Sequence, residues 1–235
     1  MIIRPPNAAG NLYASDADEL VTDIAQDLLA MPKGIEFPYA LVVPHAEMKV
    51  SGRASAAAFR HLSKYYPYIN RVVIIGAASN GVVGAALPIC DEYKTPLGRV
   101  KVTERYINSL ALLPFVHRSD REHNKSNRIE AQLPYLQTCL SDFEILPVLI
   151  GQMSDLDMNL LFTSLPFNNQ TLTILSVDID KHKQRCMDLH EQRLFENYVN
   201  YIEFEERKLK HADNFDTELA PSDEFRSKYQ SFIVH

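Results

Sequence analysis

The sequence predicts an α/β fold, a three-layer α/β/α sandwich around a central mixed, mostly parallel sheet. Apolar strands alternate with amphipathic helices along the chain, which is typical of parallel sheets covered by helices. Residues 71–75 (RVVII) and 171–177 are apolar on both faces, as central strands of such a sheet must be. We therefore expect one domain over residues 1–235, with both runs inside one sheet.

The first half of the chain opens with a helix whose start is marked by a capping box. Asp16 and Glu19 have the required spacing, and apolar residues follow at helical intervals until Pro32. The elements expected after it are a strand at 39–43, a helix at 53–66, the strand at 71–75, a loop at 77–84, strands at 85–89 and 98–102, and a helix at 103–113.

The second half continues the alternation and ends in a polar segment. Ser154 and Asp157 have the spacing that caps a helix between two apolar strands. Residues 211–228 are acidic with few apolar anchors, so we expect them to be mobile and to be cut first by proteases. The other expected elements are a polar loop at 117–128, a helix at 129–140, strands at 144–150 and 171–177, a long helix at 181–210 and an edge strand at 229–234.

Composition narrows the classes of function. The net charge of −6 and the pI of about 5.7 argue against a nucleic-acid-binding protein, which needs a basic face. The apolar runs are too short to span a membrane. Cys90, Cys139 and Cys186 are widely spaced without a CxxC pair, and no signal peptide is visible, which predicts reduced thiols in a cytoplasmic protein.

Candidate functional residues gather where predicted strands end. In open α/β sheets, ligands bind beyond the carboxyl ends of the strands. His45 follows the strand at 39–43, residues 76–80 follow the strand at 71–75, and residues 178–182 follow the strand at 171–177. The loop at 122–127 could cover all three segments.

These segments, in this order, resemble the Memo family. Residues 4–13 (RPPNAAGNLY) are similar to the family's opening motif, and residues 43–46 (VPHA) to its Pro-His-Ala segment. Residues 93–98 (YKTPLG), 129–136 (IEAQLPYL) and 145–151 (ILPVLIG) resemble its later turn, helix and strand. Several motifs in the right order predict shared ancestry and fold.

The resemblance implies the fold of class III extradiol dioxygenases, which hold a non-haem iron, but most of the implied metal positions are replaced here. His45 is kept and Asp178 is retained. Ser79, with Asn80 beside it, stands at the second histidine, and Asn127 stands at the third. At the last histidine the chain has Lys181, followed by His182. We expect the cleft to contain these residues, namely His45, Ser79, Asn80, Asn127, Asp178 and His182, and to bind no metal cofactor.

Two functions stay open. The first is a non-catalytic protein, a pseudoenzyme, that binds an unknown protein or small molecule. The resemblance to the Memo family suggests pathway partners of the radical-SAM or AMMECR type, and that family includes a phosphotyrosine-peptide binder. The second is a dioxygenase or redox enzyme using iron, copper or zinc in a rebuilt site of His45, His123, His182 and Asp178. If no such metal site exists, we expect His45 to be an ordinary hydrogen-bonded histidine and His123 to be a solvated loop residue. Ser79 lacks the Gly-x-Ser-x-Gly context of a hydrolase nucleophile.

Overall fold

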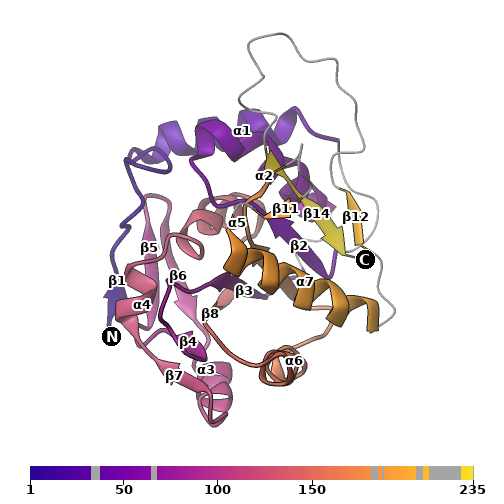
Figure 1. The fold of residues 1–235 in the computed structure, drawn as a ribbon. Helices are drawn as coiled ribbons and strands as arrows, with labels where there is room; N and C mark the ends of the chain where they lie inside the picture. The colour runs from indigo at the N-terminus through magenta and orange to yellow at the C-terminus, as the bar shows by residue number, and fades with distance from the viewer. Residues whose placement is uncertain are drawn as a thin grey trace.

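The structure, a computed structural model, is a three-layer α/β/α fold, as the sequence predicted (Figure 1). It describes residues 1–32, 38–64, 68–180, 185–186, 188–204, 209–211 and 229–234. Within these ranges the main sheet has the order β1 (Ile3–Arg4), β5 (Glu92–Thr95), β6 (Gly98–Val102), β8 (Glu144–Ile150), β3 (Arg71–Ala77), β9 (Thr171–Ser176), β2 (Ala40–Val43), β14 (Phe232–Val234) and β12 (Leu209–His211).

The middle of this sheet is parallel. Strands β6, β8, β3, β9 and β2 all run in the same direction. Toward the edges, β5 pairs antiparallel with β6, β14 with β2 and β12 with β14. Both strands predicted to be central are interior, because β3 lies between β8 and β9, and β9 lies between β3 and β2. Beside the main path lie β4 (Ala85–Leu87) and β7 (Val116–Arg118); a smaller antiparallel sheet contains β10 (Ile179–Asp180), β11 (Arg185–Cys186) and β13 (Tyr229–Gln230).

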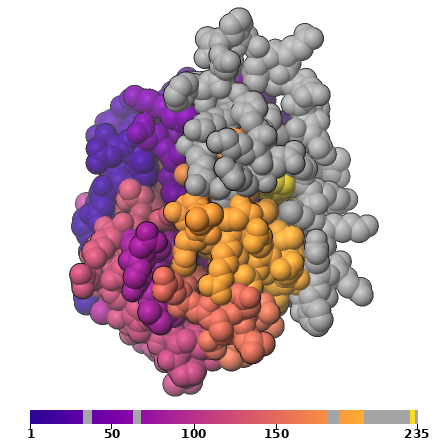
Figure 2. Space-filling model, viewed as in Figure 1, coloured from indigo at the N-terminus to yellow at the C-terminus, as the bar shows by residue number. Residues whose placement is uncertain are grey.

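Helices cover both faces of the sheet. Alternate residues of β3 enter two different apolar clusters, since successive side chains of a strand point to opposite faces. One cluster is closed by α1 (Ala17–Leu29), α2 (Met48–Phe59) and α5 (Leu133–Cys139). The other is closed by α3 (Glu104–Leu110), α6 (Asp155–Ser164) and α7 (Leu189–Phe204), of which α6 and α7 lie side by side in Figure 2.

Helix α2 begins before the residues expected to start it. A helix was predicted at 53–66, whereas α2 already begins at Met48 and is followed by the 3-10 turn η1 (Arg60–Lys64). A Cβ on Gly52 would stand 2.4 Å from an Asp27 carboxylate oxygen and 3.3 Å from the Tyr135 hydroxyl. Gly52 therefore allows α1 and α5 to pack closely against α2. Glycine is more common at helix ends, so the sequence alone does not indicate this packing role.

The segment at 117–128 was expected to be an irregular loop, but it contains β7 and the short helix α4 (Asp120–Asn124). Ser119 caps α4 by accepting a hydrogen bond from the backbone of Glu122. The expected helix at 129–140 is a 3-10 turn, η2 (Glu130–Gln132), followed by α5.

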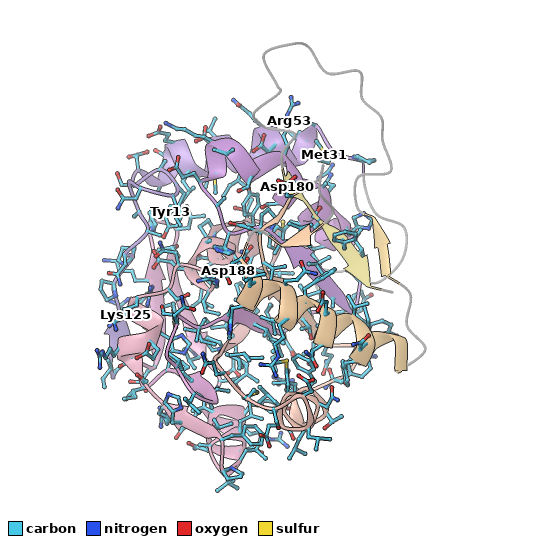
Figure 3. All side chains as sticks on the ribbon, viewed as in Figure 1. Tyr13, Met31, Arg53, Lys125, Asp180 and Asp188 are labelled. Carbon is cyan, nitrogen blue, oxygen red and sulfur yellow. The ribbon has the colours of Figure 1, made fainter. Side chains whose placement is uncertain are left out.

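The last helix is shorter than the range 181–210 predicted for it. Helix α7 begins at Leu189, because the Asp188 carboxylate accepts hydrogen bonds from the backbone of His190 and Glu191 and so caps it (Figure 3). Upstream, residues 185–186 form β11 instead of helix. The expectation of mobility for 211–228 lies outside the described residues, except that His211 belongs to β12. Within the ranges described, no helix is long and apolar enough to cross a membrane.

Candidate functional site

The parallel strands bring separate parts of the chain to one edge of the sheet, here called the strand-end edge and defined by the residues that follow β2, β3 and β9. Val43 of β2 and Gly76 of β3 both pair in register with Ser176 of β9. His45 and Asp178 therefore emerge next to each other, although 133 positions separate them in the sequence.

His45 lies between two carboxylates. Its backbone N–H donates to Asp178 Oδ1 at 2.8 Å, and its ring Nδ1 stands 3.6 Å from the same oxygen. On the other side of the ring, Nε2 is 3.4 Å from Glu191 Oε1. Burial lowers the pKa of His45 to about 4, against the raising effect of Glu191 and with a further lowering effect of Arg128. The imidazole is therefore neutral at neutral pH.

Glu191 is a residue of this edge that the sequence analysis did not identify. It comes from the first turn of α7, and its side chain is only 2% exposed. Its Oε1 accepts from Arg128 Nε at 2.8 Å and pairs with Arg128 Nη2 at 2.6 Å. Its Oε2 accepts from the backbone N–H of Asp178 at 3.0 Å. One carboxylate thus ties α7 to the end of β9 and to the segment before η2.

Arg128 contacts the sheet through its aliphatic stem and its backbone carbonyl. A Cβ on Gly76 would stand 2.9 Å from the Cβ of Arg128, so the absence of a side chain at Gly76 lets the arginine lie across the end of β3. The Arg128 carbonyl accepts from the Ser176 hydroxyl at 2.8 Å. That hydroxyl accepts from Gln132 Nε2 at 2.9 Å, and the same amide donates to the carbonyl of Pro44 at 3.0 Å.

Among the predicted cleft residues, the structure brings His45 and Asp178 together. Ser79 is half-buried and Asn80 exposed, both just beyond β3, at the same edge of the sheet. Asn127 is exposed and directly precedes Arg128. His182 lies outside the described residues. The convergence of the whole set in one cleft stays a prediction.

His123 is not the solvated loop residue that it was expected to be. It is 1% exposed in α4, with Nδ1 2.8 Å from the Tyr93 hydroxyl and Nε2 3.0 Å from the carbonyl oxygen of Ala86. Burial lowers its pKa to about 4. Because one ring nitrogen must donate and the other accept, both are occupied, and neither is left to bind a metal with His45.

The donors at the strand-end edge fit a transition metal poorly. Such a metal needs about three converging imidazole, thiolate or carboxylate groups. In the part of the chain that the structure describes, no three His, Cys, Asp or Glu side chains are placed to hold one. The Arg128 guanidinium, a permanent cation, is bonded to the Glu191 carboxylate beside His45.

A second buried network explains why two distant motifs occur together. Glu130 is fully buried and pairs with Arg4 Nη1. It also accepts from the backbone of Ala8 at 2.7 Å and from the Tyr13 hydroxyl at 2.6 Å. Arg4 in turn donates to the carbonyl of His123 at 3.1 Å. The opening motif and the motif at 129–136 therefore form one structural unit, which Arg4 also bonds to the backbone of residues 123 and 126.

Comparison with known proteins agrees with this fold. The family model described as "Memo-like protein" matches residues 4–219. The chain is similar to MEMO1 family proteins of Methanobrevibacter smithii (31% identical over 168 residues, covering 65% of this chain and 58% of the relative) and Thermotoga neapolitana (34% over 168 residues, 65% and 60%). It is also similar to one of Methanocaldococcus jannaschii (27% over 233 residues, 85% and 81%).

The chain thus spans about three fifths of the length of the first two of these relatives. The match of the family model covers most of the chain, including both strand ends that carry His45 and Asp178 and the helix that carries Glu191. This chain belongs to the Memo family.

Proposed function

We propose that this Memo-family chain acts by binding a small ligand or a protein partner at the strand-end edge, and not by metal-dependent catalysis. The observation that carries the proposal is the ion pair between Arg128 and Glu191 beside His45. Both oxygens of Glu191 are already engaged, so a metal ion would have to displace the guanidinium before it could use this carboxylate.

A cavity between the N-terminal segment, α1 and the start of α2 offers space for a small ligand next to the segment that carries His45, although His45, Arg128, Asp178 and Glu191 do not line it. Its volume is about 560 Å³, within the usual range for small-molecule sites. Glu47 and Met48, which follow His45 by two and three residues, contribute to its lining together with residues 10–15. A ligand held there would lie close to the retained histidine segment.

The first prediction concerns metal content. The wild-type protein, purified without a metal-affinity tag, is expected to carry less than about one tenth of an equivalent of iron, copper or zinc, because His45 and Asp178 are too few good ligands. Elemental analysis measures this directly. Stoichiometric metal that is lost in His45→Ala would contradict the proposal and favour the alternative, a redox enzyme or dioxygenase with a rebuilt site.

A series of variants tests whether Arg128 lowers the affinity of this edge for a metal ion. Ser79→His with Asn127→His restores the family's imidazoles and should raise zinc affinity. Adding Arg128→Ala should raise it by roughly another tenfold or more, since the competing cation is gone. Calorimetric titration of zinc compares the variants, and Arg118→Ala, which removes a more exposed guanidinium, is the matched control. No gain from Arg128→Ala would show that the arginine does not exclude the metal.

A further inference from the structure

We infer that the strand-end edge is a carboxylate-binding site, and that Glu191 is its tethered resident ligand. This inference rests on the proposed function and names the ligand chemistry of the same site. Donors from separate segments converge on Glu191: Arg128 Nε and Nη2 reach Oε1, and the backbone N–H of Asp178 reaches Oε2. His45 Nε2 faces Oε1 at 3.4 Å. Donors on both oxygens select a planar anion with two acceptor atoms.

The donors come from segments other than the helix that supplies the carboxylate. The Ser176 hydroxyl bonds the Arg128 backbone carbonyl, and the aliphatic stem of Arg128 lies across Gly76; both of these residues belong to the sheet. The N–H of Asp178 comes two positions after β9 ends, and His45 comes two positions after β2 ends. Glu191 alone comes from α7. The donors therefore belong to the sheet and to the segment before η2, whereas the carboxylate that they bind comes from α7.

The carboxylate of Asp178 does not fill the same role. Its Oδ1 accepts the backbone N–H of His45 at 2.8 Å and lies 3.6 Å from His45 Nδ1, on the other side of the ring from Glu191. Among the described residues, the carboxylate that pairs with Arg128 is that of Glu191, and its removal would leave a largely buried guanidinium that attracts another anion.

A tethered ligand also implies competition. Because Glu191 is part of the chain, its effective concentration at the donors is on the order of millimolar or higher. An external ligand must displace it, which would break the bonds of Glu191 to Arg128 and to the N–H of Asp178. His190, in the same turn of α7, would still bond to the carbonyl of Ile150 in β8. The ligand class is thus a carboxylate, either of a free small acid or of an acidic side chain on a peptide, that competes with Glu191.

The experiment is chemical rescue of Glu191→Ala. This substitution removes the CγH2–COO⁻ group, which has the heavy atoms of acetate. Thermal unfolding is followed at pH 7.5 in metal-depleted buffer, in sodium acetate and in sodium chloride of equal ionic strength. We expect the Tm of the variant to rise saturably with acetate, with a Kd on the order of millimolar, and the wild type not to respond.

Three comparisons make the result decisive. Glu196→Ala, on the same helix and exposed, should show no specific acetate effect. Glu191→Ala with Arg128→Ala should lose the rescue, since the main donor is gone. An equal response to acetate and chloride, or rescue that survives the loss of Arg128, overturns the inference. If Glu191→Ala does not fold alone, folded protein recovered by refolding in acetate but not in chloride supports it, and no recovery overturns it.

Two further arms separate the ligand sources and the two proposals. A capped tripeptide Gly-Glu-Gly that binds Glu191→Ala at least about tenfold more tightly than acetate identifies an acidic peptide, and equal binding identifies a small acid. Metal content is measured on the same preparations. Stoichiometric metal would overturn the proposed function without altering the acetate result, and absent rescue would overturn the carboxylate site without altering the metal result.

Discussion

Glu130→Gln is expected to lower the free energy of unfolding by about 3–5 kcal/mol, the range for breaking a buried ion pair on one side. Glu130 is fully buried and serves four donors, namely Arg4, the backbone N–H groups of Asn7 and Ala8, and the Tyr13 hydroxyl. The neutral amide would leave the Arg4 guanidinium, 3% exposed, without its counter-charge. Burial and Glu130 both raise the pKa of Tyr13, which keeps its hydroxyl protonated as a donor.

Urea denaturation of wild type and variant measures this change. The control is Asp155→Asn, which breaks the exposed pair between Asp155 and Arg193 and should change stability little, because solvent screens such pairs. A loss for Glu130→Gln no greater than that of the control would show that this network does not hold the opening segment. The pair Arg4→Met with Glu130→Leu should cost less than the single charge removal, since no buried charge is left unpaired.

His123 is expected to make the protein lose stability as the pH falls from about 6.5 to about 4. Burial lowers the pKa of the folded state to about 4, whereas an unfolded histidine titrates near 6.5. Between these values the unfolded chain binds the proton and the folded chain does not. The stabilisation is therefore complete above pH 6.5, and about 3 kcal/mol of it is lost on reaching pH 4.

The measurement is urea denaturation at several pH values for wild type and His123→Gln. Glutamine keeps one donor and one acceptor but does not titrate, so the variant should show a shallower decline in stability below pH 6.5. Other groups contribute equally to both proteins, which leaves the difference in slope to His123. Parallel pH profiles for the two proteins would mean that His123 is protonated as readily in the folded state as in the unfolded one.

The sequence by itself determined the family and the sheet. The apolar runs in β3 and β9 predicted interior strands, because a strand that is buried on both faces is apolar at successive positions, and this pattern is visible in the sequence of the strand itself. The strand-end rule then placed His45 and Asp178 at one edge, and the structure joins them. Helix limits were less well determined, since Gly52 and Asp188 act through contacts that depend on neighbouring elements or on the exact turn.

Only the tertiary structure decided what surrounds His45 and where His123 lies. Arg128 and Glu191 are 63 positions apart, and each read alone as an ordinary charged residue of a loop or helix. The sequence around His123 predicts a polar loop. The side chain is nevertheless buried, because the Tyr93 hydroxyl and the Ala86 carbonyl satisfy its two ring nitrogens. A charged or polar side chain can be buried only when its partners arrive from other elements, and no local pattern records such partners.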